Sequence, residues 1–219
     1  MTQSAPAWAS AVGAGIDAAG IRHVVYVPDN PLAHVLRVLA RDHSNIRATI
    51  ATREEEAFGI AAGLYLGGAR AAVLLQSSGL GNSLNALTSL LIPYQIPVAI
   101  VVSMRGDVGE WNAAQVPMGR AVRAIFDAIG VAHATAASPD TTADTVRSAA
   151  ATAFDTRLPS ACLLPRNLTA GPVAPRTSVA SERVGGLAGR QPRERSGDLG
   201  APASERVGGL AGRQPPSKK

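Results

Sequence analysis

Two segments of this sequence hold the residue types that could do chemistry, and the first is Thr52–Gly63. It places three consecutive carboxylates, Glu54 to Glu56, in the first turn of a predicted helix whose remaining residues are almost all apolar. A helix this apolar is typically buried, so its first turn lies at the edge of a core. A carboxylate held there can have a raised proton affinity and can act as an acid or a base.

The second segment is Gln76–Asn85, which contains the run Gly79-Leu80-Gly81-Asn82. Glycines allow a backbone to approach a ligand closely. The run lacks the Gly-Lys-Ser/Thr of a P-loop and the third glycine of the dinucleotide fingerprint. By itself it is a weak signal. Both segments, however, follow a predicted strand and open a predicted helix, which suggests that they share one site.

The sequence alone assigns the three glutamates different roles. Thr52 is a good helix N-cap, and Glu55 follows it by three residues, which predicts a capping box. Glu56 is expected to be solvated. Two interpretations stay open for Glu54. One is structural, a favourable placement near the positive end of the helix, and the other is catalytic.

The elements that must position these residues alternate between helix and strand along residues 1–171. Strands are predicted at 23–27, 46–51, 71–75, 98–102, 131–134 and 161–164, and helices at 8–19, 32–40, 54–66, 80–91, 119–129 and 141–154. The alternation predicts an α/β fold with a doubly wound, mostly parallel six-stranded sheet and helices on both faces. Ligands of such folds bind at the carboxyl ends of the strands. The polar loops at 28–30, 52–54, 76–82 and 103–119 should therefore meet at one edge.

Residues 172–219 have a different composition, rich in Arg, Gly, Pro and Ser, and we expect a disordered basic tail. The segment 180–192 recurs unchanged at 203–215. The tail carries nine Lys or Arg and four Asp or Glu, which accounts for the whole net charge of +5. The high pI is therefore no argument for nucleic-acid binding by the folded part. A basic arm for an acidic partner is the functional alternative.

Other residue types narrow the class further. The single cysteine, Cys162, lies in an apolar run and is expected to be a buried hydrophobe. The spacing of Cys and His predicts neither a disulfide framework nor a metal site. The sequence shows no signal peptide and no apolar run long enough for a membrane span, so we expect a cytoplasmic protein.

Together the loops resemble the pyrimidine-binding domain of thiamine-diphosphate-dependent decarboxylases, in particular the family of sulfopyruvate and phosphonopyruvate decarboxylases. The resemblance covers about residues 5–170. Its specificity comes from ordered pieces with preserved spacing, namely Thr52–Glu56 with Gly59 to Gly63, Gln76–Leu87, Ile96-Pro97, Arg105–Glu110 and Ala114–Gly119.

The resemblance assigns roles to individual residues. In the family a glutamate lies nine residues before the helix glycine, and counting back from Gly63 gives Glu54. That glutamate hydrogen-bonds N1′ of the aminopyrimidine ring and so helps the cofactor to lose its C2 proton. The cofactor-binding residues implied are Glu54, Gly79, Gly81 and Asn82, and the substrate-binding residues are Asn30, Arg105 and Gln115.

The resemblance also implies a partner. The family holds the diphosphate and Mg²⁺ through a Gly-Asp-Gly motif with a later Asn, and this sequence contains no Gly-Asp-Gly. We therefore expect residues 1–171 to be the pyrimidine-binding half of the enzyme and a separate beta subunit to carry the diphosphate-binding half. The expected substrate is a small anionic 2-oxo acid, sulfopyruvate first and phosphonopyruvate as the alternative. A non-catalytic subunit of the same fold, or a nucleotide-binding domain, also stays open.

Overall fold

The computed structural model describes residues 5–107 and 110–170. Helices and strands alternate along these residues, as the sequence predicts, and the strands are the short apolar runs between the helices. The elements are α1 (Ala7–Ala18), β1 (His23–Tyr26), α2 (Leu32–Asp42), β2 (Arg47–Ile50), α3 (Glu54–Leu66), β3 (Ala71–Gln76), α4 (Gly79–Ala86), η1 (Leu87–Leu91), β4 (Ala99–Ser103), η2 (Ala113–Gln115), α5 (Val116–Ile129), β5 (Ala132–Thr135), α6 (Pro139–Thr156), β6 (Ser160–Leu164) and α7 (Arg166–Thr169).

The six strands form one sheet in the order β2-β1-β3-β4-β6-β5, and every neighbouring pair is parallel. The predicted α/β fold is thus confirmed, with a sheet that is wholly parallel. The register aligns Gln76 with Ser103 and Ser103 with Leu164, so the strands end level with one another. The chain runs outward from β1 to β2 and then back past β1 to β3, which opens a crevice at the carboxyl ends of β1 and β3.

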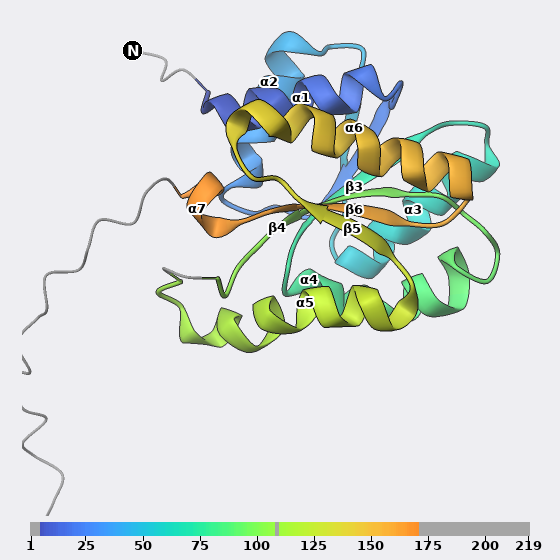
Figure 1. Ribbon diagram of the computed structural model, residues 1–219. Helices are drawn as coiled ribbons and strands as arrows, with labels where there is room; N and C mark the ends of the chain where they lie inside the picture. Colours follow the sequence, from blue (N-terminus) through green and yellow to red (C-terminus); the bar gives the residue numbers. More distant parts are fainter. Residues whose placement is uncertain (1–4, 108–109, 171–219) are drawn as a thin grey trace, which may run out of the picture. The chain divides into compact units, whose positions relative to one another are not determined.

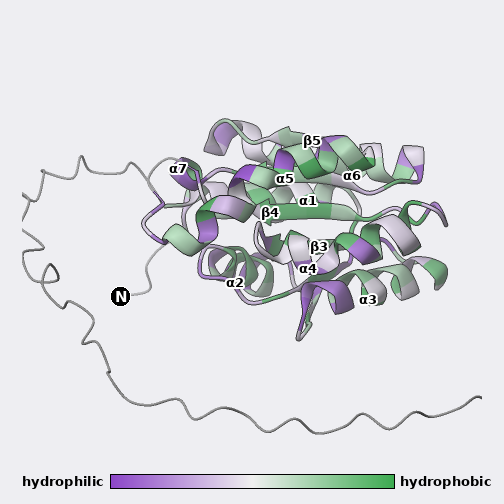
Figure 2. Ribbon diagram, turned by 90° about the horizontal axis from the view of Figure 1, so that it is seen from below, coloured by the Kyte–Doolittle hydropathy of each residue, from purple (hydrophilic) through white to green (hydrophobic). Residues whose placement is uncertain are grey.

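Helices cover both faces of the sheet (Figure 1), with α1, α2 and α6 on one side and α3, α4 and α5 on the other. Each layer buries its own aromatic or large aliphatic residues, such as Phe58 and Phe126 on one face and Ile16 and Leu39 on the other. All five residues of β4 are buried, and Figure 2 shows this central strand as hydrophobic. Burial on both faces explains why the strand reads as a continuous apolar run.

The layers pack closely where the sequence supplies small residues. A Cβ on Gly15 of α1 would lie 2.6 Å from the carbonyl oxygen of Ala143 on α6, so glycine is what allows these two helices to touch. Cys162 on β6 is fully buried, as expected from its apolar surroundings.

Several element bounds differ from those predicted. Helix α5 begins at Val116 after a 3-10 turn, three residues earlier than predicted, because Pro117 fits the first turn of a helix instead of stopping it. The helix predicted over 80–91 is α4 followed by the π-turn η1, and α7 was not predicted.

The repeat-containing segment 172–219 lies outside the described residues, so the expectation of a disordered tail stays a prediction. Among the described helices, none combines the length and the apolar character that crossing a bilayer requires. Over residues 5–107 and 110–170, no three His, Cys, Asp or Glu side chains gather in a way that could hold a metal ion.

A candidate active site at the carboxyl edge of the sheet

Glu54 is the first residue of α3 and one of few buried charged side chains, with 7% of its surface exposed. The preceding residue, Arg53, is extended and ends the loop that follows β2, so Glu54 enters the helix at the edge of the core. One carboxylate oxygen, Oε2, accepts a hydrogen bond from Asn82 Nδ2 at 3.3 Å. Within the described part of the chain this is the only hydrogen bond to that carboxylate. The group therefore keeps most of its hydrogen-bonding capacity.

Gly79 lies directly against Glu54. A Cβ built on Gly79 would overlap the Glu54 side chain, approaching its Cδ at 2.5 Å. Glycine at this position is what lets the first turn of α4 pack on the carboxylate. The two segments that the sequence singled out are thus in contact, through Gly79 and through Asn82.

The capping interactions at this helix differ from those predicted. Because Arg53 is the N-cap, the residue at the third helical position is Glu56, and its Oε2 accepts hydrogen bonds from the backbone N–H of Thr52 at 2.7 Å and the Thr52 hydroxyl at 2.6 Å. These bonds lower the pKa of Glu56. The prediction that Glu55 caps the helix was wrong, since the helix begins two residues after Thr52. Glu55 and Glu56 are both exposed, as predicted for Glu56.

Gly81 is exposed, and a Cβ there would make only an ordinary contact of 3.5 Å with Met118 Sδ. The packing of the chain itself therefore does not require glycine at this position. Met118 lies in the first turn of α5, three residues after Gln115. The segment that contains Gln115 is in this way brought up to the Gly79–Asn82 turn.

Arg105, which follows β4, makes a two-point ion pair with Glu110. Its Nε and Nη2 donate to the two carboxylate oxygens of Glu110 at 2.8 and 3.1 Å. The Glu110 side chain is 1% exposed, and the pairing lowers its pKa from 4.5 to about 2. Arg166 of α7 approaches the same carboxylate, with Nε 3.7 Å from Oε2. Neither Glu110 nor Arg166 was predicted as a site residue.

Asp29, in the loop after β1, completes this charged cluster. Its Oδ1 lies 4.0 Å from Arg105 Nη1, and its side chain is 6% exposed. Burial raises the pKa of the Asp29 carboxyl above its ordinary value of 3.8. Asn30, the neighbouring residue predicted to face the substrate, is exposed. No described contact joins Asn30 or Gln115 to Glu54.

The same edge contains buried polar atoms with no hydrogen-bond partner among the described residues: Asp29 Oδ2, Gln76 Oε1, Ser103 Oγ and Gln115 Oε1. Buried polar groups in proteins are nearly always paired, so a group of unpaired ones suits a place where a polar ligand or another chain binds. Asp29 lies in the loop after β1, Gln76 and Ser103 are the last residues of β3 and β4, and Gln115 ends η2.

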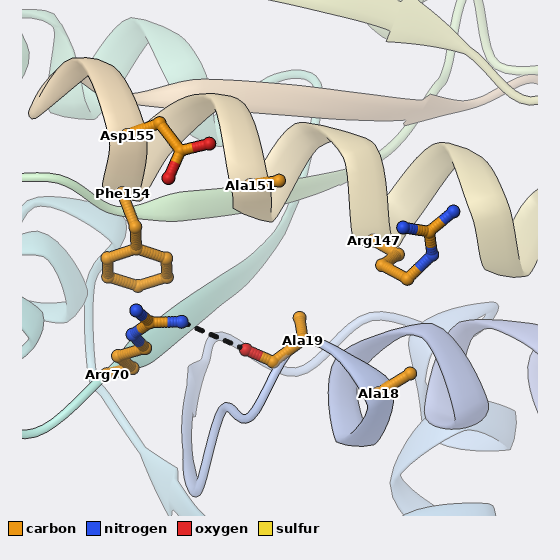
Figure 3. A pocket seen from close by; sticks show the side chains of 7 residues that line it. All are labelled: Ala18, Ala19, Arg70, Arg147, Ala151, Phe154 and Asp155. Carbon is orange, nitrogen blue, oxygen red and sulfur yellow. Dashed lines mark hydrogen bonds between the residues drawn. The ribbon is translucent and has the colours of Figure 1, made fainter.

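A pocket of about 240 Å³ lies at the opposite, amino-terminal edge of the strands. Figure 3 shows the Arg70 guanidinium against the Phe154 ring, 4.7 Å from the ring centre, and its Nη1 bonded to the carbonyl oxygen of Ala19 at 3.4 Å. The cation thus stabilises the carboxyl end of α1. These contacts give Arg70 a structural role, away from the predicted site residues.

The sequence of this chain is similar to those of known proteins. The family described as "Thiamine pyrophosphate enzyme, N-terminal TPP binding domain" matches residues 8–115. The chain is 46% identical over 129 residues to the sulfopyruvate decarboxylase subunit alpha of Methanothermobacter thermautotrophicus, covering 59% of this chain and 78% of that protein. It is 38% identical over 145 residues to the subunit of the same name from Methanococcus maripaludis, covering 66% and 86%.

A longer relative is the phosphonopyruvate decarboxylase of Streptomyces viridochromogenes, 34% identical over 187 residues, or 85% of this chain and 44% of that protein. The chain thus spans less than half of this relative. Among solved structures, a 2-oxoglutarate:ferredoxin oxidoreductase from Magnetococcus marinus has a TM-score of 0.63 at 15% identity, covering 74% of this chain and 29% of that one. This likeness concerns the fold alone.

Two residues of the cluster could have been noticed in the sequence. Asp29 stands directly after the first strand, where side chains reach the ligand edge. Glu110 lies five residues after Arg105 inside the long polar loop. Neither spacing identifies an ion pair, because both contacts depend on the order of the strands and the path of the loop.

Proposed function

The chain belongs to the family of thiamine pyrophosphate enzymes, and from this premise we propose that it is the alpha subunit of a thiamine-diphosphate-dependent decarboxylase. The proposed reaction converts sulfopyruvate to sulfoacetaldehyde and CO₂. The observation that carries the proposal is the packing of Glu54 on Gly79, with Asn82 as its one described donor.

The residues around Glu54 suit the aminopyrimidine ring of the cofactor. The carboxylate is buried and has one donor, so an oxygen remains to share a proton with a ring nitrogen. Gly79, which packs on Glu54, and Gly81, in the same turn of α4, present backbone without side chains there. When bound, thiamine diphosphate supplies the electron sink for loss of CO₂.

The part played by this chain is then to hold the ring and its proton. Glu54, buried and with one described hydrogen bond, would share a proton with the ring nitrogen. Asn82 fixes the direction of the Glu54 carboxyl through Oε2. We assign Asn30, Arg105 and Gln115 to the substrate side, on the loops that follow β1 and β4.

We further propose that a separate beta subunit holds the diphosphate and Mg²⁺, with the cofactor at the boundary between the two chains. The names of the relatives as alpha subunits support a partner. In favour of the runner-up substrate, phosphonopyruvate, the relative that matches the largest share of this chain is a phosphonopyruvate decarboxylase.

The decisive experiment combines the full chain with a beta subunit from a sulfopyruvate decarboxylase and measures CO₂ release from both keto acids. Glu54→Gln should lower turnover by roughly 100- to 10,000-fold, the usual contribution of acid–base catalysis. Glu55→Gln is the matched control, because Glu55 is the exposed neighbour. Unchanged turnover in Glu54→Gln would favour a non-catalytic subunit of the same fold.

A further inference from the structure

Glu110 is the most completely bonded carboxylate at the carboxyl edge, and nothing above gives it a function. Besides the two bonds from Arg105, its oxygens accept the backbone N–H of Asn112 at 3.0 Å and that of Gly106 at 3.4 Å. This buried group thus accepts four hydrogen bonds and has a second cation, Arg166, at 3.7 Å. We infer that Glu110 is a positioning residue, which holds the Arg105 guanidinium so that Nη1 can bind the second acid group of the substrate.

Arg105 is held both at its backbone and at its guanidinium. Its backbone N–H donates to Ser77 Oγ at 3.0 Å, which ties it to the turn just before Gly79. Its Nε and Nη2 are engaged by Glu110, so the guanidinium plane has one orientation. A planar guanidinium held by a two-point pair cannot rotate without breaking both bonds.

This orientation leaves Nη1 available. Among the described residues Nη1 makes no hydrogen bond, and its nearest acid, Asp29, forms only a long ion pair with it at 4.0 Å. Burial raises the pKa of the Asp29 carboxyl above its ordinary value. An anionic group arriving beside Asn30, the neighbour of Asp29, would find a cation whose direction is already fixed.

The local backbone supports the same arrangement. Gly106 has a φ of +74°, and a Cβ there would lie 2.8 Å from the carbonyl oxygen of Gln115. A Cβ on Gly119 would overlap the carbonyl of Arg105. The two glycines let the loop fold back on the start of α5, with Gln115 beside Gly106 and Gly119 beside Arg105. Loss of the Glu110 charge should therefore loosen Arg105 first, while the core of the sheet remains.

The inference rests on the proposed function, and it predicts a selective defect. In the assembled enzyme, Glu110→Gln should raise the KM for sulfopyruvate about 10- to 100-fold, the usual effect of losing a well-placed charged hydrogen bond, with kcat changed only a few-fold. The inhibition constant of pyruvate, which lacks the second acid group, should stay the same. Asp144→Asn is the matched control, since it removes the carboxylate of an exposed ion pair with Arg147.

A second measurement needs only the full chain. Trypsin cleaves after arginine, and the bound Arg105 side chain is 13% exposed, so cleavage there should be slow. Mass spectrometry should detect cleavage at Arg105 about ten-fold faster or more in Glu110→Gln, because cleavage follows local opening, and no change in Asp144→Asn.

The outcomes separate the two proposals. If the unmodified complex turns over no 2-oxo acid, the proposed function fails, whatever the trypsin result. If the complex is active and Glu110→Gln weakens the binding of sulfopyruvate and of pyruvate equally, or changes the binding of neither, the inference is overturned. Faster cleavage without the selective change in KM would also overturn it, since Arg105 would then be held for the fold alone.

Discussion

The contact between Gly79 and Glu54 makes a prediction that the isolated full chain can test. In Gly79→Ala, the new Cβ would overlap the Glu54 side chain, with Cδ at 2.5 Å, so Glu54 or the first turn of α4 must move. Forcing extra atoms into a packed site costs about 1–3 kcal/mol. Displacing Glu54 also breaks its bond with Asn82, a further cost of about 1 kcal/mol. We expect the free energy of unfolding to fall by about 2–4 kcal/mol.

The matched control is Gly59→Ala in the neighbouring helix. A Cβ on Gly59 meets nothing within 4 Å, and the position is exposed within α3. Alanine there should raise the free energy of unfolding by about 0.5–1 kcal/mol, because glycine is a poor helix former. Urea unfolding followed by circular dichroism measures both variants. If Gly79→Ala were as stable as the unmodified chain, the packing of α4 against Glu54 described above would be wrong.

Two more predictions concern charged residues that take no part in that contact. Because the folded pKa of Glu110 is about 2 instead of 4.5, its pairing stabilises the fold above the unfolded pKa and is lost as the pH falls toward 2. Between pH 5 and pH 3 the unmodified chain should lose at most about 2 kcal/mol more than Glu110→Gln in urea unfolding, and equal losses would contradict the pairing. At the other edge, Arg70→Ala should lower stability by about 1 kcal/mol through loss of its contacts with Phe154 and Ala19. Arg147→Ala, which breaks only an exposed pair, should change thermal unfolding much less, and an equal effect of the two would count against the role of Arg70.

The sequence predicted the layers of this fold well because its periodicity is strong. Strands β3 and β4 are buried on both faces, and such strands read as nearly continuous apolar runs bounded by turns that contain glycine or proline. The start of α5 was misplaced because Pro117 resembles a helix stop. Proline is tolerated in the first turn of a helix, because the N–H that it lacks would have no partner within the helix there.

The candidate site was predictable only in part, for a physical reason. Glu54, Gly79 and Asn82 lie at the starts of two helices, so local patterns place them at the same edge. The cluster of Arg105 and Asp29 joins loops that follow β4 and β1, and these strands are separated by β3. A sequence does not reveal that strand order, so it could name Arg105 as a cation of interest without identifying its partners.

The two buried glutamates at this edge differ in how much of their hydrogen-bonding capacity the chain itself uses. Both are almost inaccessible, at 7% for Glu54 and 1% for the Glu110 side chain, and either would draw attention in the sequence. Glu110 accepts four hydrogen bonds, so its oxygens have little left for a ligand. Glu54 accepts a single described bond, at 3.3 Å, although a carboxylate has room for about four. Leaving a buried acceptor so poorly bonded costs stability unless another molecule completes it. The unused hydrogen-bonding capacity of Glu54, beside the side-chain-free Gly79, is therefore the reason why we propose Glu54 as the residue that would meet the cofactor ring.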